Sequence, residues 1–99
     1  PRPTFLFKNL IIESSRPFGP ERNHLELVFK KTTGEIIKAI AFFACTEAYK
    51  INKKVTNHIF GDLNLWPGRE IDLLAQIEKS NFYSRPELRL KIVDLAEIS

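Results

Sequence analysis

Hydrophobic and polar residues alternate along most of this chain, in the two-residue rhythm that is typical of β-strands. The clearest alternation covers residues 24–31, where one face is apolar and the other is mostly polar or charged. A short polar segment with Gly34, which is suited to a turn, leads into a second alternating segment at 36–43. The pattern predicts a β-hairpin over 24–43. Its inward face would carry Leu25, Leu27 and Phe29.

Three further segments predict strands. Residues 4–12 are rich in Phe and Ile, and residues 16–23, with two prolines and a glycine, predict a loop after them. Residues 69–79 and 87–95 alternate again, and the polar stretch 80–86 between them predicts another loop. The inward positions of the last two strands would be Ile71, Leu73, Ala75 and Ile77, followed by Leu88, Leu90 and Ile92.

The period changes over residues 46–62, where the spacing predicts an α-helix. Thr46 is suited to an N-cap, an apolar stripe follows at helical spacing and ends at Ile59, and Gly61 is suited to the C-terminus. The order is therefore three strands, one helix and two strands. This order predicts a mainly β protein, a five-stranded OB-fold Greek-key barrel with one α-helix between strands 3 and 4. An SH3-like barrel is the main alternative, although a helix of about four turns before strand 4 is atypical of it.

Composition narrows the class of protein. The chain has 99 residues, 43% of them hydrophobic, which suits a single domain over 1–99. It lacks the long apolar run of a membrane span, and its single cysteine fits a reducing, cytoplasmic compartment. The chain has no methionine and begins at Pro1, so we expect it to be part of a larger protein.

Residues for catalysis or metal binding are scattered. His24, His58 and Cys45 are isolated from one another and from paired carboxylates, and the four glycines occur singly. A metal site or a nucleophilic site needs several such groups at defined spacing. The sequence therefore predicts no enzymatic activity, metal or cofactor in this chain.

Basic and aromatic residues interleave in two segments, and this combination suits single-stranded nucleic acid, because cations follow phosphates and rings stack on bases. The net charge of +3 permits such a partner. Two other interpretations remain open: the rings pack inward, or the cations only solvate the surface. The candidate residues near the hairpin are Arg16, Arg22, Lys30 and Lys38, and those around the last loop are Lys79, Phe82, Tyr83, Arg85, Arg89 and Lys91.

Five short sequence segments, in their order along the chain, resemble the OB domain of RecJ-type single-strand-specific 5′→3′ DNA exonucleases. The string PGREIDL resembles a strand entry in that family, and ELRLKIVD resembles the family's closing strand. Lys38 stands where the family often has an acidic residue, and Arg89 where it often has glutamine, so the surface is more cationic here. The strings cover residues 1–5, 24–27, 38–42, 67–73 and 87–94.

The resemblance implies an accessory domain that holds single-stranded DNA for a separate catalytic core of the same polypeptide, in DNA repair and recombination. That core would use manganese or magnesium, and its Asp-His-His region is not in this chain. Two alternatives stay open. In the first, the domain is an interdomain or protein-interaction module without its own nucleic-acid binding, because fold does not fix function. In the second, it binds RNA, because stacking surfaces accept either nucleic acid.

Overall fold

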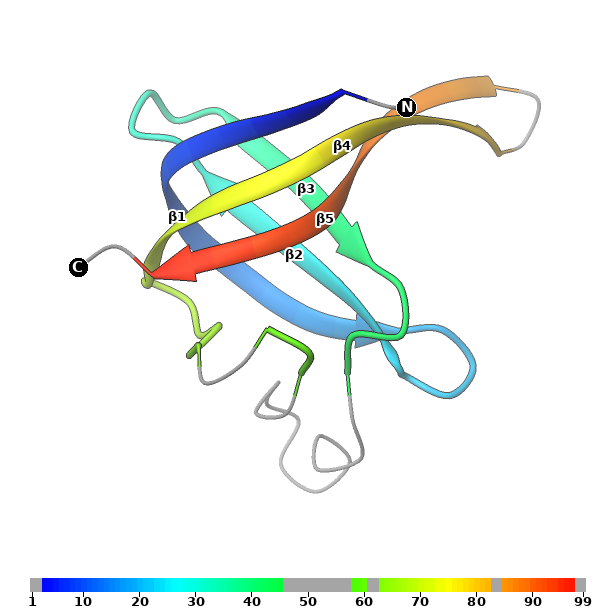
Figure 1. The fold of residues 1–99 in the computed structure, drawn as a ribbon, viewed down its shortest axis with the longest axis horizontal. Coiled ribbons are helices and arrows are strands. Elements are labelled where there is room, and N and C mark those ends of the chain that lie inside the picture. The colour runs from blue at the N-terminus through cyan, green and yellow to red at the C-terminus, as the bar shows by residue number, and fades with distance from the viewer. Residues whose placement is uncertain (1–2, 46–57, 61–62, 83–84, 98–99) are drawn as a thin grey trace.

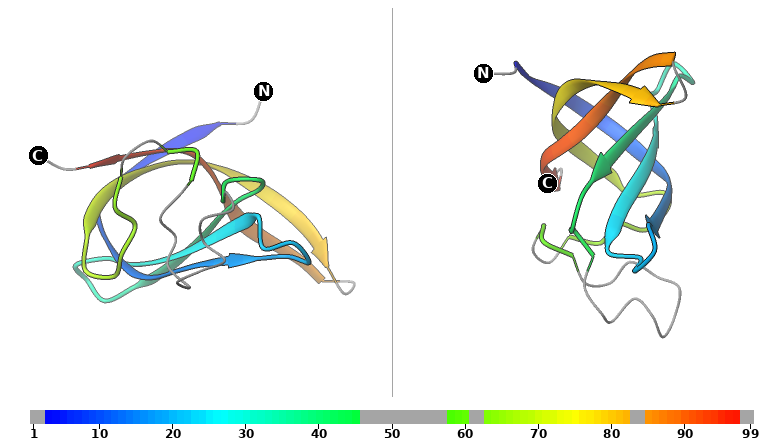
Figure 2. Two further views of the ribbon diagram at one scale, coloured as in Figure 1. Left: turned by 90° about the horizontal axis from the view of Figure 1, so that it is seen from below. Right: turned by 90° about the vertical axis from the view of Figure 1, so that its right-hand side faces the viewer.

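The computed structural model describes residues 3–45, 58–60, 63–82 and 85–97, and for 80–82 and 85–88 it describes the backbone alone. Five strands make up a closed barrel in the order β1-β2-β3-β5-β4 (Figures 1 and 2). Only β3 and β5 are parallel. This order is that of an OB-fold, so the five-stranded barrel is confirmed. The strands are β1 (Thr4–Phe18), β2 (His24–Lys30), β3 (Ile36–Ala41), β4 (Glu70–Phe82) and β5 (Arg85–Glu97).

Strand β1 is long because it pairs with two neighbours in succession. Its first part pairs with β4, from Thr4 opposite Gln76, and its second part pairs with β2, ending at Phe18 opposite His24. The register shifts between Phe7 and Leu10, where Asn9 has a positive φ of 59°. Bulges of this kind bend a strand and let it change partners.

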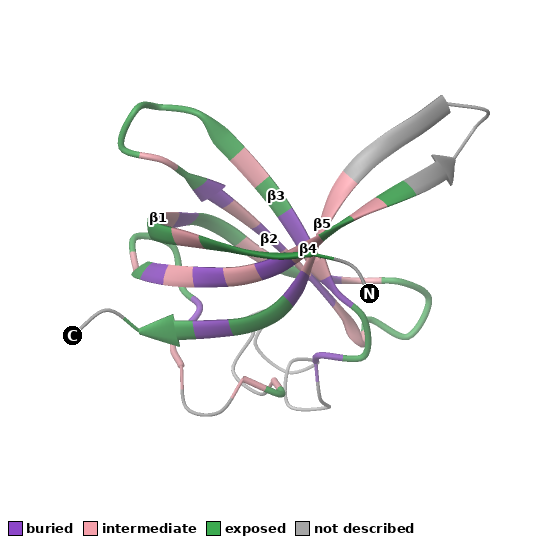
Figure 3. Ribbon diagram, turned by 45° about the horizontal axis from the view of Figure 1, so that its top comes forward, coloured by how far each residue is buried: buried purple, intermediate pink, exposed green. Residues whose placement is uncertain are grey.

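Apolar side chains of alternating residues fill the barrel. Leu25, Leu27 and Phe29 of β2 are fully buried, as are Ile71, Leu73 and Ala75 of β4, as predicted (Figure 3). In β5 the register shifts opposite Leu74 and Ala75, so that both Ile92 and Leu95 are buried although they are three positions apart. The predicted inward position Ile77 is instead 36% exposed, because it lies beyond the closed part of the barrel.

Two predicted loops are shorter than expected. Residues 16–18 belong to β1, and β4 and β5 continue as a ladder to the pair Phe82–Arg85. Both segments contain a proline, Pro17 or Pro86, which suggested a loop. Proline is tolerated in a strand where its missing N–H is not needed for the ladder, and β5 is paired with β3 only at Leu90 and Lys91.

The helix predicted over 46–62 lies mostly outside the described residues, and at 58–60, near its expected end, the prediction is wrong. His58 makes an isolated bridge with Cys45, and Ile59 lies in a turn with 62% of its surface exposed. The His58 ring fixes this turn, because Nδ1 accepts the Phe60 N–H at 3.1 Å and Nε2 lies 2.7 Å from the Leu63 carbonyl oxygen. In the described part of the chain, no helix is long and apolar enough to cross a membrane.

Candidate nucleic-acid interface

An aromatic cluster lies on the outer surface where β1, β2 and β3 come together. Phe18 ends β1, His24 begins β2, and Phe42 follows the last residue of β3. Because Leu25 and Ala41 point into the barrel, their neighbours His24 and Phe42 point outward. The ring centroid of His24 lies 5.3 Å from that of Phe18, in tilted geometry, and 5.2 Å from that of Phe42, in edge-to-face geometry.

His24 lies at the centre of this cluster and orients a fourth ring. Its Nδ1 accepts the backbone N–H of Phe43 at 3.0 Å, and the two ring centroids are 4.7 Å apart. Phe43 has a positive φ of 55°, a conformation that costs free energy in a bulky residue. The result is that Phe43 is 71% exposed and Phe42 is 36% exposed. Two consecutive aromatic residues therefore face solvent, each in contact with His24.

Arg89 of β5 brings a cation to this surface. Its guanidinium carbon lies 5.3 Å from the centre of the Phe42 ring, within the range of a cation–π interaction. Its Nε donates to Oε1 of Glu78 on the paired position of β4, at 2.6 Å. Glu78 thus holds the arginine in place next to the ring, with about a third of the Arg89 side chain still exposed.

Four more of the predicted cations lie on the same face. Arg22 is exposed in the β1–β2 loop, between Phe18 and His24 in sequence, and Lys38 is exposed on β3. Lys91 pairs with Ile40 across the β3–β5 contact. These three make no ion pair with the described residues. Arg16 is paired with Glu26 at 3.0 Å, but its side chain is still 67% exposed.

The remaining predicted residues are not brought into this group. Lys30 is exposed at the far end of β2, opposite Ile36. Lys79 is two positions after Ile77, so it lies on the opposite face of the β4–β5 hairpin from Glu78. Tyr83 and the side chains of Phe82 and Arg85 lie outside the described part of the structure, so their role stays a prediction.

The family model of the RecJ OB domain matches residues 1–94. The chain belongs to this family. The resemblance inferred from the sequence is therefore confirmed. No curated protein matches the chain at a significant level. In RecJ-like proteins the OB domain is a non-catalytic module, and in the described part of this RecJ OB domain no three His, Cys, Asp or Glu residues are grouped to hold a metal ion.

The exposed rings of this RecJ OB domain, Phe42 and Phe43, are not among the residues predicted from the sequence. The predicted rings are Phe82 and Tyr83, and His24 is isolated in the sequence. A signal for Phe42 was present, because inward Ala39 and Ala41 imply an outward residue 42. No such signal existed for His24, whose ring partners come from positions 18, 42 and 43 and meet only after folding.

Proposed function

We propose that this RecJ OB domain binds single-stranded DNA on the outer surface around Phe42 and Phe43, and that it serves a metal-dependent 5′→3′ exonuclease core of the same polypeptide in DNA repair and recombination. The observation that carries the proposal is the pair of exposed rings Phe42 and Phe43, with Arg89 next to the first of them. Unstacked bases gain about 1–3 kcal/mol each by stacking on such rings. Bases in a duplex are already stacked, so this surface favours single strands.

The position of the surface in the barrel supports the proposal. OB-folds bind oligonucleotides on the face of strands 2 and 3 and with the loop between strands 1 and 2. Here that face carries Phe42 at the end of β3 and Arg22 in the β1–β2 loop. By family analogy this is where DNA is expected, and the chain offers rings and cations there.

The charges favour a phosphate backbone that passes beside the rings. Five cations on this face outnumber the three nearby carboxylates, and three of the cations make no ion pair with other described residues. These side chains would neutralise phosphates and release the counterions condensed on the DNA, so binding should weaken with salt. The cations are Arg16, Arg22, Lys38, Arg89 and Lys91, and the carboxylates are Glu21, Glu26 and Glu78.

Fluorescence anisotropy with labelled oligo-dT tests the role of the rings. If each ring stacks one base, Phe42→Ala and Phe43→Ala should each weaken binding by roughly 5- to 150-fold. Phe5→Ala is the matched control, because the Phe5 ring is similarly exposed, at 41%, but lies on the part of β1 that pairs with β4. Equal affinities of all three variants would remove the rings from the site.

A salt titration tests the cations. Replacing Lys38 and Lys91 together by glutamine should flatten the slope of log affinity against log salt by about 1.4, since each single-strand phosphate contact contributes about 0.7. Lys8→Gln, on the first part of β1, removes a positive charge away from this face and should leave the slope unchanged. A domain that binds no oligo-dT at low salt would refute the proposal, and tighter binding of oligo-rU would assign the surface to RNA.

A further inference from the structure

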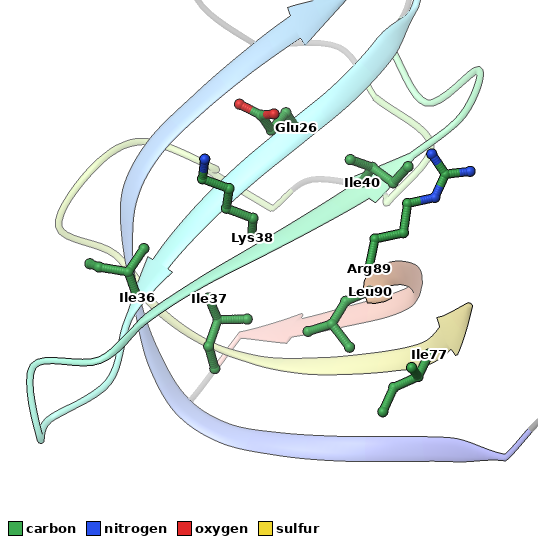
Figure 4. A pocket seen from close by; sticks show the side chains of 8 residues that line it. All are labelled: Glu26, Ile36, Ile37, Lys38, Ile40, Ile77, Arg89 and Leu90. Carbon is green, nitrogen blue, oxygen red and sulfur yellow. The ribbon is translucent and has the colours of Figure 1, made fainter. Parts of the chain in front are cut away.

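A second surface feature lies where β3 and β5 separate. The two strands pair only at Ala39–Leu90 and Ile40–Lys91. Beyond these pairs the β2–β3 hairpin and the β4–β5 hairpin diverge, so that the barrel wall is open between them (Figure 3). The opening forms a groove with a volume of about 470 Å³ (Figure 4). We call it the β3–β5 split. Its lining residues are Glu26, Ile36, Ile37, Lys38, Ile40, Ile77, Arg89 and Leu90.

The first half of β3 presents backbone groups to this split. The Lys31 N–H donates to the Glu35 carbonyl at 2.8 Å and closes the hairpin. Hydrogen-bonded and non-hydrogen-bonded pairs alternate in an antiparallel ladder, so Ile37 directs its backbone groups to β2 and Ile36 directs its own away from β2. Among the described residues no strand pairs with Ile36 on that side. Such an edge is a template for another strand.

The floor of the split is aliphatic. Ile37, Ile77 and Leu90 occupy inward positions of their strands but are only partly covered, and Ile36 at the rim is 55% exposed. Aliphatic side chains at every second residue of an added strand would cover them. Nucleic acid suits this site poorly, since it lacks the regularly spaced N–H and C=O groups of a peptide and its bases stack on rings rather than on isoleucine.

The charges of the lining indicate which partner fits. Glu26 is paired with Arg16, and Arg89 is paired with Glu78. Lys38 makes no ion pair with the described residues, and its side chain is exposed on the outer side of β3. The split therefore has one uncompensated positive charge, which an acidic side chain on the outward face of an added strand would neutralise.

We propose that the β3–β5 split binds an extended peptide segment of a partner protein, which pairs as an added strand with the edge of β3. The segment carries aliphatic residues at alternate positions toward Ile37, Ile77 and Leu90, and an acidic residue toward Lys38. The split shares Lys38 and Arg89 with the proposed DNA surface. The edge of β3 and the aliphatic floor are used by the peptide alone, so peptide binding is tested separately from DNA binding.

A labelled peptide, Thr-Val-Thr-Val-Asp-Val-Thr-Val-Thr, tests the proposal on the 99-residue chain. Its anisotropy should saturate, and it should slow amide exchange at Ile36 and Lys38. Two N-methylated versions test backbone pairing, one methylated at the valines and one at the other positions. At least one of them should lose binding. If both methylated versions bind the protein as tightly as the unmodified peptide does, strand addition is refuted.

A charge exchange tests the role of Lys38. Replacing the peptide Asp by Lys should weaken binding by up to about fivefold, the upper end of the range for an exposed ion pair, and Lys38→Glu should reverse this preference. Lys8→Glu, on β1, should leave the preference unchanged. Three results would overturn the proposal: no peptide binding to the folded chain at millimolar concentration, protection of the Ile36 amide by oligo-dT instead, or dimerisation of the chain through this edge.

Discussion

Gly19→Ala would push the His24 ring out of its place in the aromatic cluster. Gly19 has a φ of +94°, and a Cβ added there would lie 2.7 Å from Cδ2 of His24. The His24 ring cannot move away without cost, because its Nδ1 holds the Phe43 N–H and its faces and edges contact Phe18 and Phe42. We therefore expect the substitution to displace His24 and to release Phe43.

The expected loss of stability has two parts. A non-glycine residue at this φ costs about 1–2 kcal/mol. Displacing His24 costs a net hydrogen bond, about 0.5–1.5 kcal/mol, and part of its ring contacts, about 0.5–1.5 kcal/mol. Gly34→Ala is a matched control, since Gly34 has the same φ of +94° with nothing within 4 Å of the added Cβ. Gly19→Ala should therefore be less stable than Gly34→Ala by about 1–3 kcal/mol.

Urea denaturation of the two variants measures this difference directly. In a domain of this size each kcal/mol also lowers Tm by roughly 4–8 °C, so thermal melting gives a second measure. The Phe43 amide resonance should shift in Gly19→Ala and stay in place in Gly34→Ala. Equal stability of the two variants, or an unchanged Phe43 resonance, would refute the contact between Gly19 and His24.

Two further predictions concern the core. Burial raises the pKa of the Cys45 thiol from 9.0 to about 11, so the folded protein holds this proton more tightly than the unfolded chain. The resulting contribution to the free energy of unfolding is fully present below pH 9. It is lost as the pH rises through about 11, and the loss is up to about 3 kcal/mol. Urea denaturation at rising pH should show a smaller loss in Cys45→Ala, and equal losses would contradict the prediction. Leu73→Ala, at a fully buried position, should destabilise the barrel by about 2–5 kcal/mol, whereas Leu6→Ala, at an exposed position, should cost far less; similar denaturation midpoints would argue against the assigned core.

The centres of the strands could be predicted from the sequence, and their ends could not. Leu25, Leu27 and Phe29 alternate with polar or less buried positions, so the two-residue period alone identifies their face. Strand ends depend on how far the pairing with the neighbouring strand continues, which the local residue types do not determine. Pro17 and Pro86 are local signals for loops, but the pairing of β1 with β2 and of β4 with β5 continues through them.

The candidate site divides in the same way. Arg89 and Lys91 could be placed together on one strand face, because alternation within a single strand suffices for this. The outward position of Phe42 follows from the same alternation, but the orientation of Phe43 could not be predicted, since it depends on where β3 ends and on the hydrogen bond from the Phe43 N–H to His24. That bond joins residues 19 positions apart, and no local pattern encodes it.

The double pairing of β1 has a consequence for how the barrel assembles. Its C-terminal half pairs with the neighbouring β2 across a short turn, whereas Phe5 in its N-terminal half pairs with Ala75, 70 positions away. Contacts between residues so distant in sequence slow folding, toward milliseconds to seconds for β-barrels of this kind. We expect the seam between β1 and β4 to close last during folding and to open first under load, with the neighbouring β1–β2 ladder still intact.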